Sequence, residues 1–165
     1  MAESFSTELL PAAKVDRYAT LAEEIGAVLD GETNLVARMS TVASMLAASF
    51  DEFFWTGFYV VDPHNPRELV VGPYQGSLGC LRIAFGRGVC GAVAQSGHPL
   101  IVPDVEAFPG HIACDSRSRS EIVLPVRDRS GNLIAVLDVD SERLAAFDAV
   151  DQAGLQPIVA LVSPD

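Results

Sequence analysis

The chain has 165 residues, of which 49% are hydrophobic and 20% are charged, and its formal net charge is -11. This length and composition indicate one compact domain with an apolar core and argue against a disordered chain. A nucleic-acid-binding surface is also disfavoured, because the 11 lysines and arginines are scattered and outnumbered by acidic residues. We expect a flexible N-terminal lead at residues 1–12 and a single domain at residues 13–165.

The N-terminus and the cysteine content bear on the compartment. Residues 1–10 carry two glutamates and lack the basic and apolar regions of a signal peptide, and no apolar run approaches membrane-spanning length. We therefore expect a cytoplasmic protein. In that compartment Cys80, Cys90 and Cys114 would be inert, metal-binding or redox-active, because structural disulfides are rare there.

The hydrophobic pattern predicts two helices first, then strands with one short helix among them, and a helix at the end. The expected helices lie at residues 15–31, 35–50, 89–95 and from 148 onward, and the expected strands at 53–62, 68–74, 80–85, 100–102, 121–127 and 133–140. About six mostly antiparallel strands with helices at both ends make an α+β fold. Residues 103–120 lack periodicity, and a loop of this length in a compact domain is commonly functional.

The strand at residues 53–62 has apolar side chains on both faces, which indicates that both faces are covered. Trp55 and Tyr59 share one face with Gly57 between them. The missing side chain at Gly57 leaves room for a guest molecule or a loop, or else allows a plain core with a closely packed backbone.

The hairpin at residues 121–140 is predicted to bring three carboxylates together. Asp138 and Asp140 share a face with Ile134, and a two-residue turn at Ser130–Gly131 would place Glu121 opposite Asp140. Like charges at such positions destabilise a sheet unless a cation, a ligand amino group or a protonated carboxyl relieves them, or unless this end of the hairpin lies in water. A carboxyl that stays protonated near neutral pH is also a general acid.

The three cysteines fit no common zinc spacing, although a zinc site built from them with His111 stays an alternative. Cys80 in a strand and Cys90 in a helix read as small buried hydrophobic residues. Cys114 lies in the polar loop near His111, Arg117 and Arg119, surroundings that could hold a thiolate. A reactive cysteine with others in reach is the arrangement of thiol redox catalysis.

Several motifs together resemble one known family. They are FFWTGFY at residues 53–59, GPYQG at 72–76, FGRGVCG at 85–91, FPGHIACD at 108–115, SRSEIV at 118–123 and LDVDS at 137–141. Over roughly residues 46–162 the chain resembles the free methionine-(R)-sulfoxide reductases, a catalytic branch of the GAF-domain fold. The resemblance implies a central, roughly six-stranded sheet with the N- and C-terminal helices on one face and the active-site loops on the other.

The resemblance also implies a role for each cysteine. Cys114 matches the catalytic cysteine, which attacks the sulfoxide sulfur, releases methionine and becomes a sulfenic acid. Cys80 matches the resolving cysteine that forms a disulfide, and Cys90 matches a third cysteine that assists resolution. The family binds no cofactor and is recycled by thioredoxin, with NADPH and thioredoxin reductase behind it, as part of the defence against oxidative stress.

The substrate pocket is implied in the same way. Glu121, Asp138 and Asp140 match carboxylates that bind the substrate amino group and assist protonation of the sulfoxide oxygen, so Glu121 also counts as catalytic. Trp55 and Tyr59 match aromatic residues against which the methyl sulfoxide packs. The resemblance implies no metal. It does imply a homodimer that forms through the N-terminal helices. The alternative is a non-catalytic GAF sensor domain that binds a small molecule without turning it over.

Overall fold

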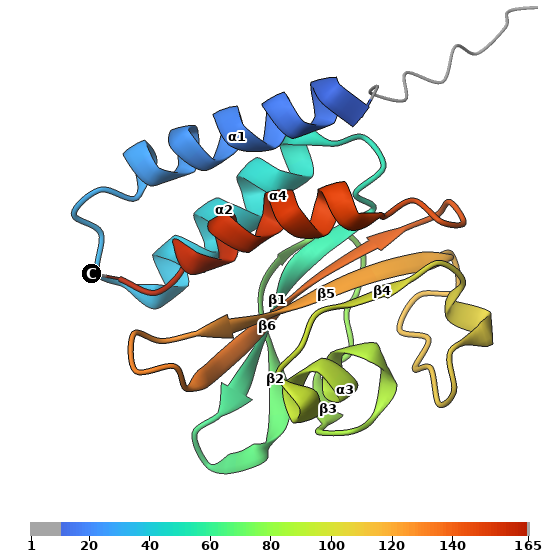
Figure 1. The fold of residues 1–165 in the computed structure, drawn as a ribbon. Helices are drawn as coiled ribbons and strands as arrows, with labels where there is room; N and C mark the ends of the chain where they lie inside the picture. Colours follow the sequence, from blue (N-terminus) through green and yellow to red (C-terminus); the bar gives the residue numbers. More distant parts are fainter. Residues whose placement is uncertain (1–10, 165) are drawn as a thin grey trace, which may run out of the picture.

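The computed structural model describes residues 11–164, which form one six-stranded antiparallel sheet with three helices on one face (Figure 1). The elements are α1 (Pro11–Val28), α2 (Leu35–Ser49), β1 (Trp55–Asp62), β2 (Asn65–Gln75), β3 (Arg82–Ala84), α3 (Gly88–Ser96), β4 (Leu100–Val102), the 3-10 turn η1 (Val105–Ala107), β5 (Ser120–Arg127), β6 (Leu133–Ser141) and α4 (Ala149–Ala160). The strand order is β3-β2-β1-β6-β5-β4. The predicted α+β architecture is confirmed.

The expected lead at residues 1–12 falls mostly outside this description. Residues 1–10 lie outside the described residues, and α1 begins at Pro11. Within the described part, no helix is both long enough and apolar enough to cross a bilayer.

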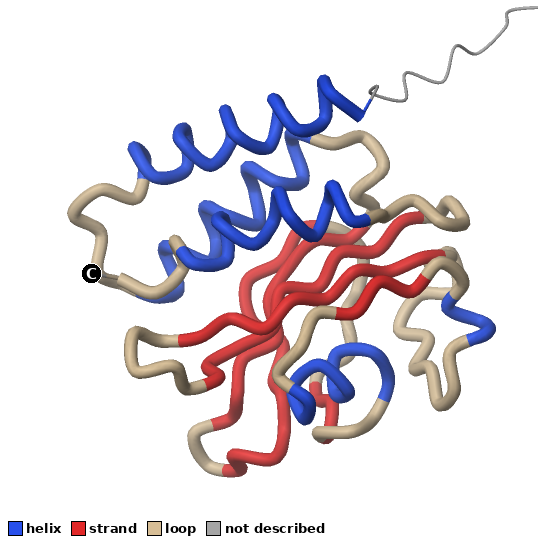
Figure 2. Tube along the Cα trace, viewed as in Figure 1, coloured by secondary structure: helices blue, strands red, loops and turns tan. Residues whose placement is uncertain are grey.

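Helices α1, α2 and α4 form a layer over one face of the sheet, while α3 and the loops lie on the other (Figures 1 and 2). The helical layer packs on side chains such as Phe58 of β1, Leu124 of β5 and Leu137 of β6, all fully buried. On α1 the predicted apolar face is only partly used, because Val15 and Val28 are 52% and 59% exposed. The second core, under α3, is the one that surrounds the site described below.

Local signals start two of the helices where the sequence predicts. The Asn34 side chain accepts a hydrogen bond from the backbone N–H of Ala37 and begins α2. Asp148 caps α4, and the Asp151 side chain accepts from the backbone N–H of Asp148 in return, which completes a capping box.

Two buried charged residues connect the helices of this layer. Arg38, 7% exposed, donates to the backbone carbonyls that end α1 and α4. Asp151 is fully buried and accepts hydrogen bonds from Lys14 at 2.7 Å and from the Tyr18 hydroxyl at 2.8 Å. Both α1 and α4 are therefore held by polar contacts as well as by apolar packing.

The β5–β6 hairpin has the predicted register where it matters for the site. Glu121 pairs with Asp140, and Asp138 lies two residues earlier on the same face. Near the turn, however, a β-bulge inserts one extra residue into β6. Leu133 consequently packs on the α3 side and Ile134 on the helix side, so the strict alternation predicted for Ile134 and Asp138 is wrong beyond the bulge.

The space above Gly57 is filled by the chain itself. Gly57 pairs with Tyr74 of β2, and a Cβ at Gly57 would collide with the Tyr74 side chain and backbone. The closely packed backbone is therefore the correct alternative, and no guest fits at Gly57. Strand β1 also starts two residues later than predicted, because Phe53 turns into the helix-side core.

Candidate active site

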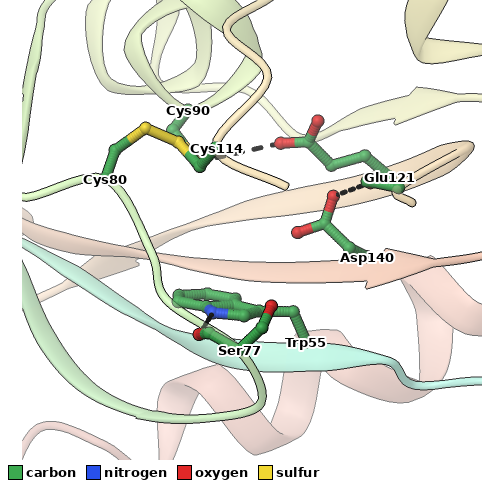
Figure 3. Close-up of a disulfide and its surroundings, with 8 residues drawn as sticks. Trp55, Ser77, Cys80, Cys90, Cys114, Glu121 and Asp140 are labelled. Atoms are coloured by element: carbon green, nitrogen blue, oxygen red, sulfur yellow. Dashed lines mark hydrogen bonds between the residues drawn. A yellow bond between two sulfur atoms is a disulfide. The ribbon is translucent and has the colours of Figure 1, made fainter. Parts of the chain in front are cut away.

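Cys80 and Cys114 are joined by a disulfide, with their Cα atoms 5.3 Å apart and a sequence separation of 34 (Figure 3). Cys80 lies in the connection from β2 to β3, and Cys114 in the long loop that precedes β5. Residue spacing alone left the pairing open. The structure brings together the two cysteines to which the resemblance assigns attack and resolution.

A small cavity lies beside this disulfide, with a volume of about 40 Å³, room for a few water molecules at most. Side chains from β1, α3, β5, β6 and both cysteine-bearing loops line it. Seven of the eight predicted site residues are among them: Trp55, Tyr59, Cys90, Cys114, Glu121, Asp138 and Asp140. The eighth, Cys80, reaches the cavity only through its bond to Cys114.

Three carboxylates crowd the inner end of the cavity, and Glu121 and Asp138 are each only 5% exposed. Burial raises the pKa of Glu121 well above its ordinary value, and the nearby Asp138 and Asp140 raise it further. Burial and then the charge of Asp140 raise the pKa of Asp138 in the same way. The interpretation that this end of the hairpin lies in water is therefore wrong.

Burial raises the pKa of Asp140 to about 6, and a hydrogen bond donated by the Ser118 hydroxyl opposes that rise. At neutral pH Asp140 is therefore mostly ionised. The raised pKa values of Glu121 and Asp138 favour the protonated form of each. One Asp138 carboxylate oxygen is buried and has no hydrogen-bond partner among the described residues. The cluster thus offers one negative charge, proton donors and an unused acceptor.

Cys90 is the free cysteine and lies buried at the start of α3. Its thiol lies 3.9 Å from a carboxylate oxygen of Glu121, to which it donates. Burial raises the pKa of the Cys90 thiol well above its ordinary value, and the charge of Asp138 adds to this effect. Cys90 is therefore a neutral thiol in this state, in keeping with the buried, unreactive character predicted for it.

The same groups bear on metal binding. The ligand atoms of Cys90, Glu121 and Asp138 all lie within 4.8 Å of one another, close enough to share a metal ion. The zinc set of three cysteines with His111 is not assembled in the described residues, because Cys80 and Cys114 are bonded to each other.

The loop that carries Cys114 is fixed by Asp115, which is not among the predicted site residues. Asp115 accepts a hydrogen bond from the Ser77 hydroxyl at 2.7 Å and from the Arg117 guanidinium at 2.9 Å. Arg117 and Ser77 hold the pKa of Asp115 well below its usual range. Ser77 in turn accepts, at its carbonyl, the indole N–H of Trp55 at 3.0 Å (Figure 3). Asp115 therefore fastens the two cysteine-bearing loops together.

These contacts change the expected surroundings of Cys114. Arg117 is engaged by Asp115 and Glu142 and stacks over the ring of Phe54 at 4.5 Å. Burial lowers the pKa of His111, so this imidazole is neutral near pH 7. Neither side chain supplies the free positive charge beside Cys114 that the sequence suggests.

Aromatic rings and a helix end complete the walls of the cavity. The Trp55 ring stacks on Tyr59 at 5.5 Å and on Tyr74 at 5.0 Å between centroids. Helix α3 begins at Gly88 in the cavity wall, and its N-cap Arg87 makes no side-chain capping bond. The positive end of the α3 dipole therefore lies at the cavity.

Comparison with known proteins identifies the class first. Residues 35–164 match the GAF domain family model, so the chain is a member of the GAF domain family. A GAF domain-containing protein of Dictyostelium discoideum is 49% identical over 94% of this chain and 96% of its own length.

The branch within that family follows from relatives whose names state an activity. The free methionine-R-sulfoxide reductase of Escherichia coli is 39% identical over 89% of this chain and 87% of its own length. The crystal structure of the free methionine-R-sulfoxide reductase from Neisseria meningitidis, in complex with its substrate, superposes with a TM-score of 0.85 at 43% identity and covers 98% of this chain and 92% of that one. The chain belongs to the family of the free methionine-R-sulfoxide reductases.

Proposed function

We propose that this protein reduces free L-methionine-(R)-sulfoxide to L-methionine by cysteine chemistry. One observation carries the proposal: the Cys80–Cys114 disulfide borders a cavity whose inner end holds three carboxylates with raised pKa values. The named relatives support the same substrate. A disulfide beside a ligand cavity is the expected product state of such a reaction.

The side chains that line the cavity have the chemistry to bind a small zwitterion with a sulfoxide at its end. The ionised Asp140 would hold the substrate ammonium, helped by the unpartnered oxygen of Asp138. The free α-carboxylate would lie at the N-terminus of α3. The methyl group would pack against Trp55 and Tyr59. A methionine sulfoxide inside a peptide has neither terminal charge, which explains a preference for the free amino acid.

The reaction we propose consumes two thiols for each sulfoxide. The Cys114 thiolate attacks the sulfoxide sulfur while protonated Glu121 gives a proton to the oxygen. The hydroxyl then passes from the substrate sulfur to the Cys114 sulfur while the bond between the two sulfurs breaks, so methionine leaves and Cys114 becomes a sulfenic acid. The Cys80 thiol attacks the Cys114 sulfur, a disulfide forms, and water leaves. Sulfoxide and two thiols thus give sulfide, disulfide and water, and the dithiol of thioredoxin restores the two thiols.

Cys90 has an accessory role in this scheme. Its neutral thiol donates to Glu121 and so helps to hold the proposed acid in place, and after reduction it is the third cysteine in reach of the site. No bound cofactor is needed. NADPH and thioredoxin reductase would supply the electrons in the cytoplasm under oxidative stress, and the protein would act as a homodimer.

An NADPH-coupled assay with thioredoxin and thioredoxin reductase tests the proposal. We expect turnover of the free R-sulfoxide, and none of the free S-sulfoxide or of a peptide containing methionine sulfoxide. Cys114→Ser should abolish turnover, whereas the matched change Cys90→Ser should leave a large part of it. Full activity of Cys114→Ser would refute the mechanism, and binding of the sulfoxide without turnover by the wild type would favour a non-catalytic GAF sensor.

A further inference from the structure

Two leucines on the loop between β2 and β3 are unusually exposed. Leu78 and Leu81 are 75% and 70% exposed, more than any other large apolar side chain in the described part of the chain. Both lie within two residues of Cys80, which forms the disulfide. Exposed apolar side chains that gather at one place commonly mark an interaction site.

The loop that carries them is anchored from below. The Ser77 hydroxyl donates to Asp115, and the Ser77 carbonyl accepts from Trp55. Gly79 lies so close to the rings of Trp55 and Tyr59 that a Cβ there would be 3.0 Å and 3.1 Å from their nearest atoms. The backbone of this loop is therefore held in place, and the two leucine side chains stay exposed to solvent.

The charge pattern of this segment also differs from the rest of the chain. No charged residue occurs from Leu69 to Leu81, whereas the whole chain has a net charge of -11. The segment itself therefore offers a partner only apolar and uncharged side chains, and the charged groups beside it, Arg82 and Asp115, are already engaged in ion pairs. Such a surface fits a partner that recognises the disulfide by apolar contact.

We propose that Leu78 and Leu81, on either side of Cys80, form the docking surface for the dithiol protein that reduces the disulfide. The inference rests on the proposed function, which requires this disulfide to be reduced in each cycle. The proposed partner is a thioredoxin-type reductant. Its attacking cysteine would need an apolar surface around it, because the disulfide that it must reach lies between two exposed leucines.

Cys114 is the more exposed of the two cysteines, but the leucines lie on either side of Cys80, so docking on them would bring the partner's thiolate to the Cys80 sulfur. Cys114 lines the cavity beside the carboxylates, whereas Cys80 does not line it. The partner's thiolate attacks the Cys80 sulfur, the Cys80–Cys114 bond breaks, and Cys114 leaves as a thiolate that takes up a proton. The thiolate of the partner's second cysteine then attacks the sulfur of the partner's first cysteine, which is bonded to Cys80 in the mixed disulfide. Cys80 leaves as a thiolate and is protonated in turn, and the partner carries away the disulfide and hence two fewer electrons.

Substitution of Leu81 tests the docking surface, since Leu81 does not line the cavity. We expect Leu81→Ser to raise the KM for thioredoxin about tenfold, the effect of losing a large part of one buried leucine contact. Leu81→Ile should stay near the wild type. The matched control Val36→Ser removes a comparably exposed aliphatic side chain, 62% exposed, from α2 on the opposite face of the sheet and should change nothing.

Two further measurements separate docking from the chemistry. Turnover with dithiothreitol, which needs no docking surface, and the methionine formed in one turnover by pre-reduced enzyme should be the same for Leu81→Ser and the wild type. An unchanged KM for thioredoxin, or an equal loss with thioredoxin and dithiothreitol, would overturn the proposal. If the pre-reduced wild type forms no methionine in a single turnover, the proposed function fails instead.

Trapping shows where the partner attacks. A thioredoxin that lacks its second cysteine should form a mixed disulfide with Cys80, identified by peptide mapping. A mixed disulfide on Cys114 would refute the docking geometry. The two leucines could instead contact a second copy of the chain, and sedimentation of Leu81→Ser tests this alternative. If the substitution dissociates a dimer, the proposal is wrong.

Discussion

Replacing Asp140 by asparagine should make the protein more stable at neutral pH, although it removes the charge that we assign to substrate binding. Burial raises the pKa of Asp140 from 3.8 to about 6 in the folded protein. Between these two pH values the folded state binds more protons than the unfolded chain, so the free energy of unfolding falls as pH rises. The favourable contribution is fully present below pH 3.8 and is lost as pH rises through about 6.

The size of the effect follows from the same values. Each pH unit between 3.8 and about 6 changes the free energy of unfolding by ~1.4 kcal/mol, which gives about 3 kcal/mol in all. This is an upper value, because Asp140 keeps some contact with solvent. The asparagine side chain cannot ionise, and it keeps an oxygen that can accept from Ser118. Relative to the wild type, Asp140→Asn should therefore gain stability at pH 7.5 and little at pH 4.

Urea unfolding at pH 4 and pH 7.5 measures this difference. Asp128→Asn is a matched control of opposite sign, because hydrogen bonds from Asn132 lower the pKa of Asp128. That substitution should cost stability at pH 7.5. A loss of stability in Asp140→Asn at pH 7.5, or a gain equal at both pH values, would refute the assignment of a raised pKa to Asp140.

The same variant separates stability from function. Free methionine-(R)-sulfoxide should raise the melting temperature of the pre-reduced wild type, because a ligand that binds only the folded state stabilises it. It should raise that of Asp140→Asn much less. If both respond equally, the substrate ammonium does not depend on Asp140.

Two substitutions in the helical layer test the buried charges. Arg38→Met should destabilise the fold by more than ~3 kcal/mol in urea unfolding, because four backbone carbonyls at the ends of α1 and α4 lose their donor; a change below ~1 kcal/mol would show that water replaces the guanidinium. Asp151→Ala should cost about 3–5 kcal/mol by leaving Lys14 with its charge buried and unpaired. The double change Lys14→Met with Asp151→Ala should recover a large part of that loss, and no recovery would contradict the buried-charge explanation.

Hydrophobic periodicity was sufficient to predict the order of helices and strands, but it did not predict correctly on which side of the sheet every side chain lies. Helices and strands were predicted from patterns that depend only on neighbouring residues, and in the structure Asn34 and Asp148 cap two helices at the predicted starts. The exceptions arise where tertiary packing overrides alternation. The bulge at Ile134 reverses the faces near the turn, and Phe53 leaves the strand pattern to pack with Phe50 and Phe147. Neither event has a marker in the local sequence.

The carboxylate cluster was predictable for a specific physical reason. A hairpin with a short turn fixes which residues face each other, and the predicted two-residue turn placed Glu121 opposite Asp140. The actual turn is one residue longer, because the backbone N–H of Asp128 donates to the carbonyl of Asn132, and the bulge in β6 restores the predicted pairing. The contact between Ser77 and Asp115 joins residues 38 apart on two irregular loops, and no periodicity reports on such a pair. Asp115 with Arg117 two residues later did carry a local signal, because aspartate commonly accepts from the backbone two residues on.

The two proposed partners of this site use different sides of one loop, and the size of the cavity sets the order in which they act. With the disulfide formed, the cavity of about 40 Å³ has room for a few water molecules. We therefore expect substrate to bind after reduction has released Cys114 from Cys80. The reductant meets Leu81 and the exposed part of Leu78 on the outside of the loop, and it acts only on the oxidised protein, to which we expect the substrate not to bind. It follows that high concentrations of methionine sulfoxide should not compete with thioredoxin, and that kcat/KM for thioredoxin should be independent of the sulfoxide concentration.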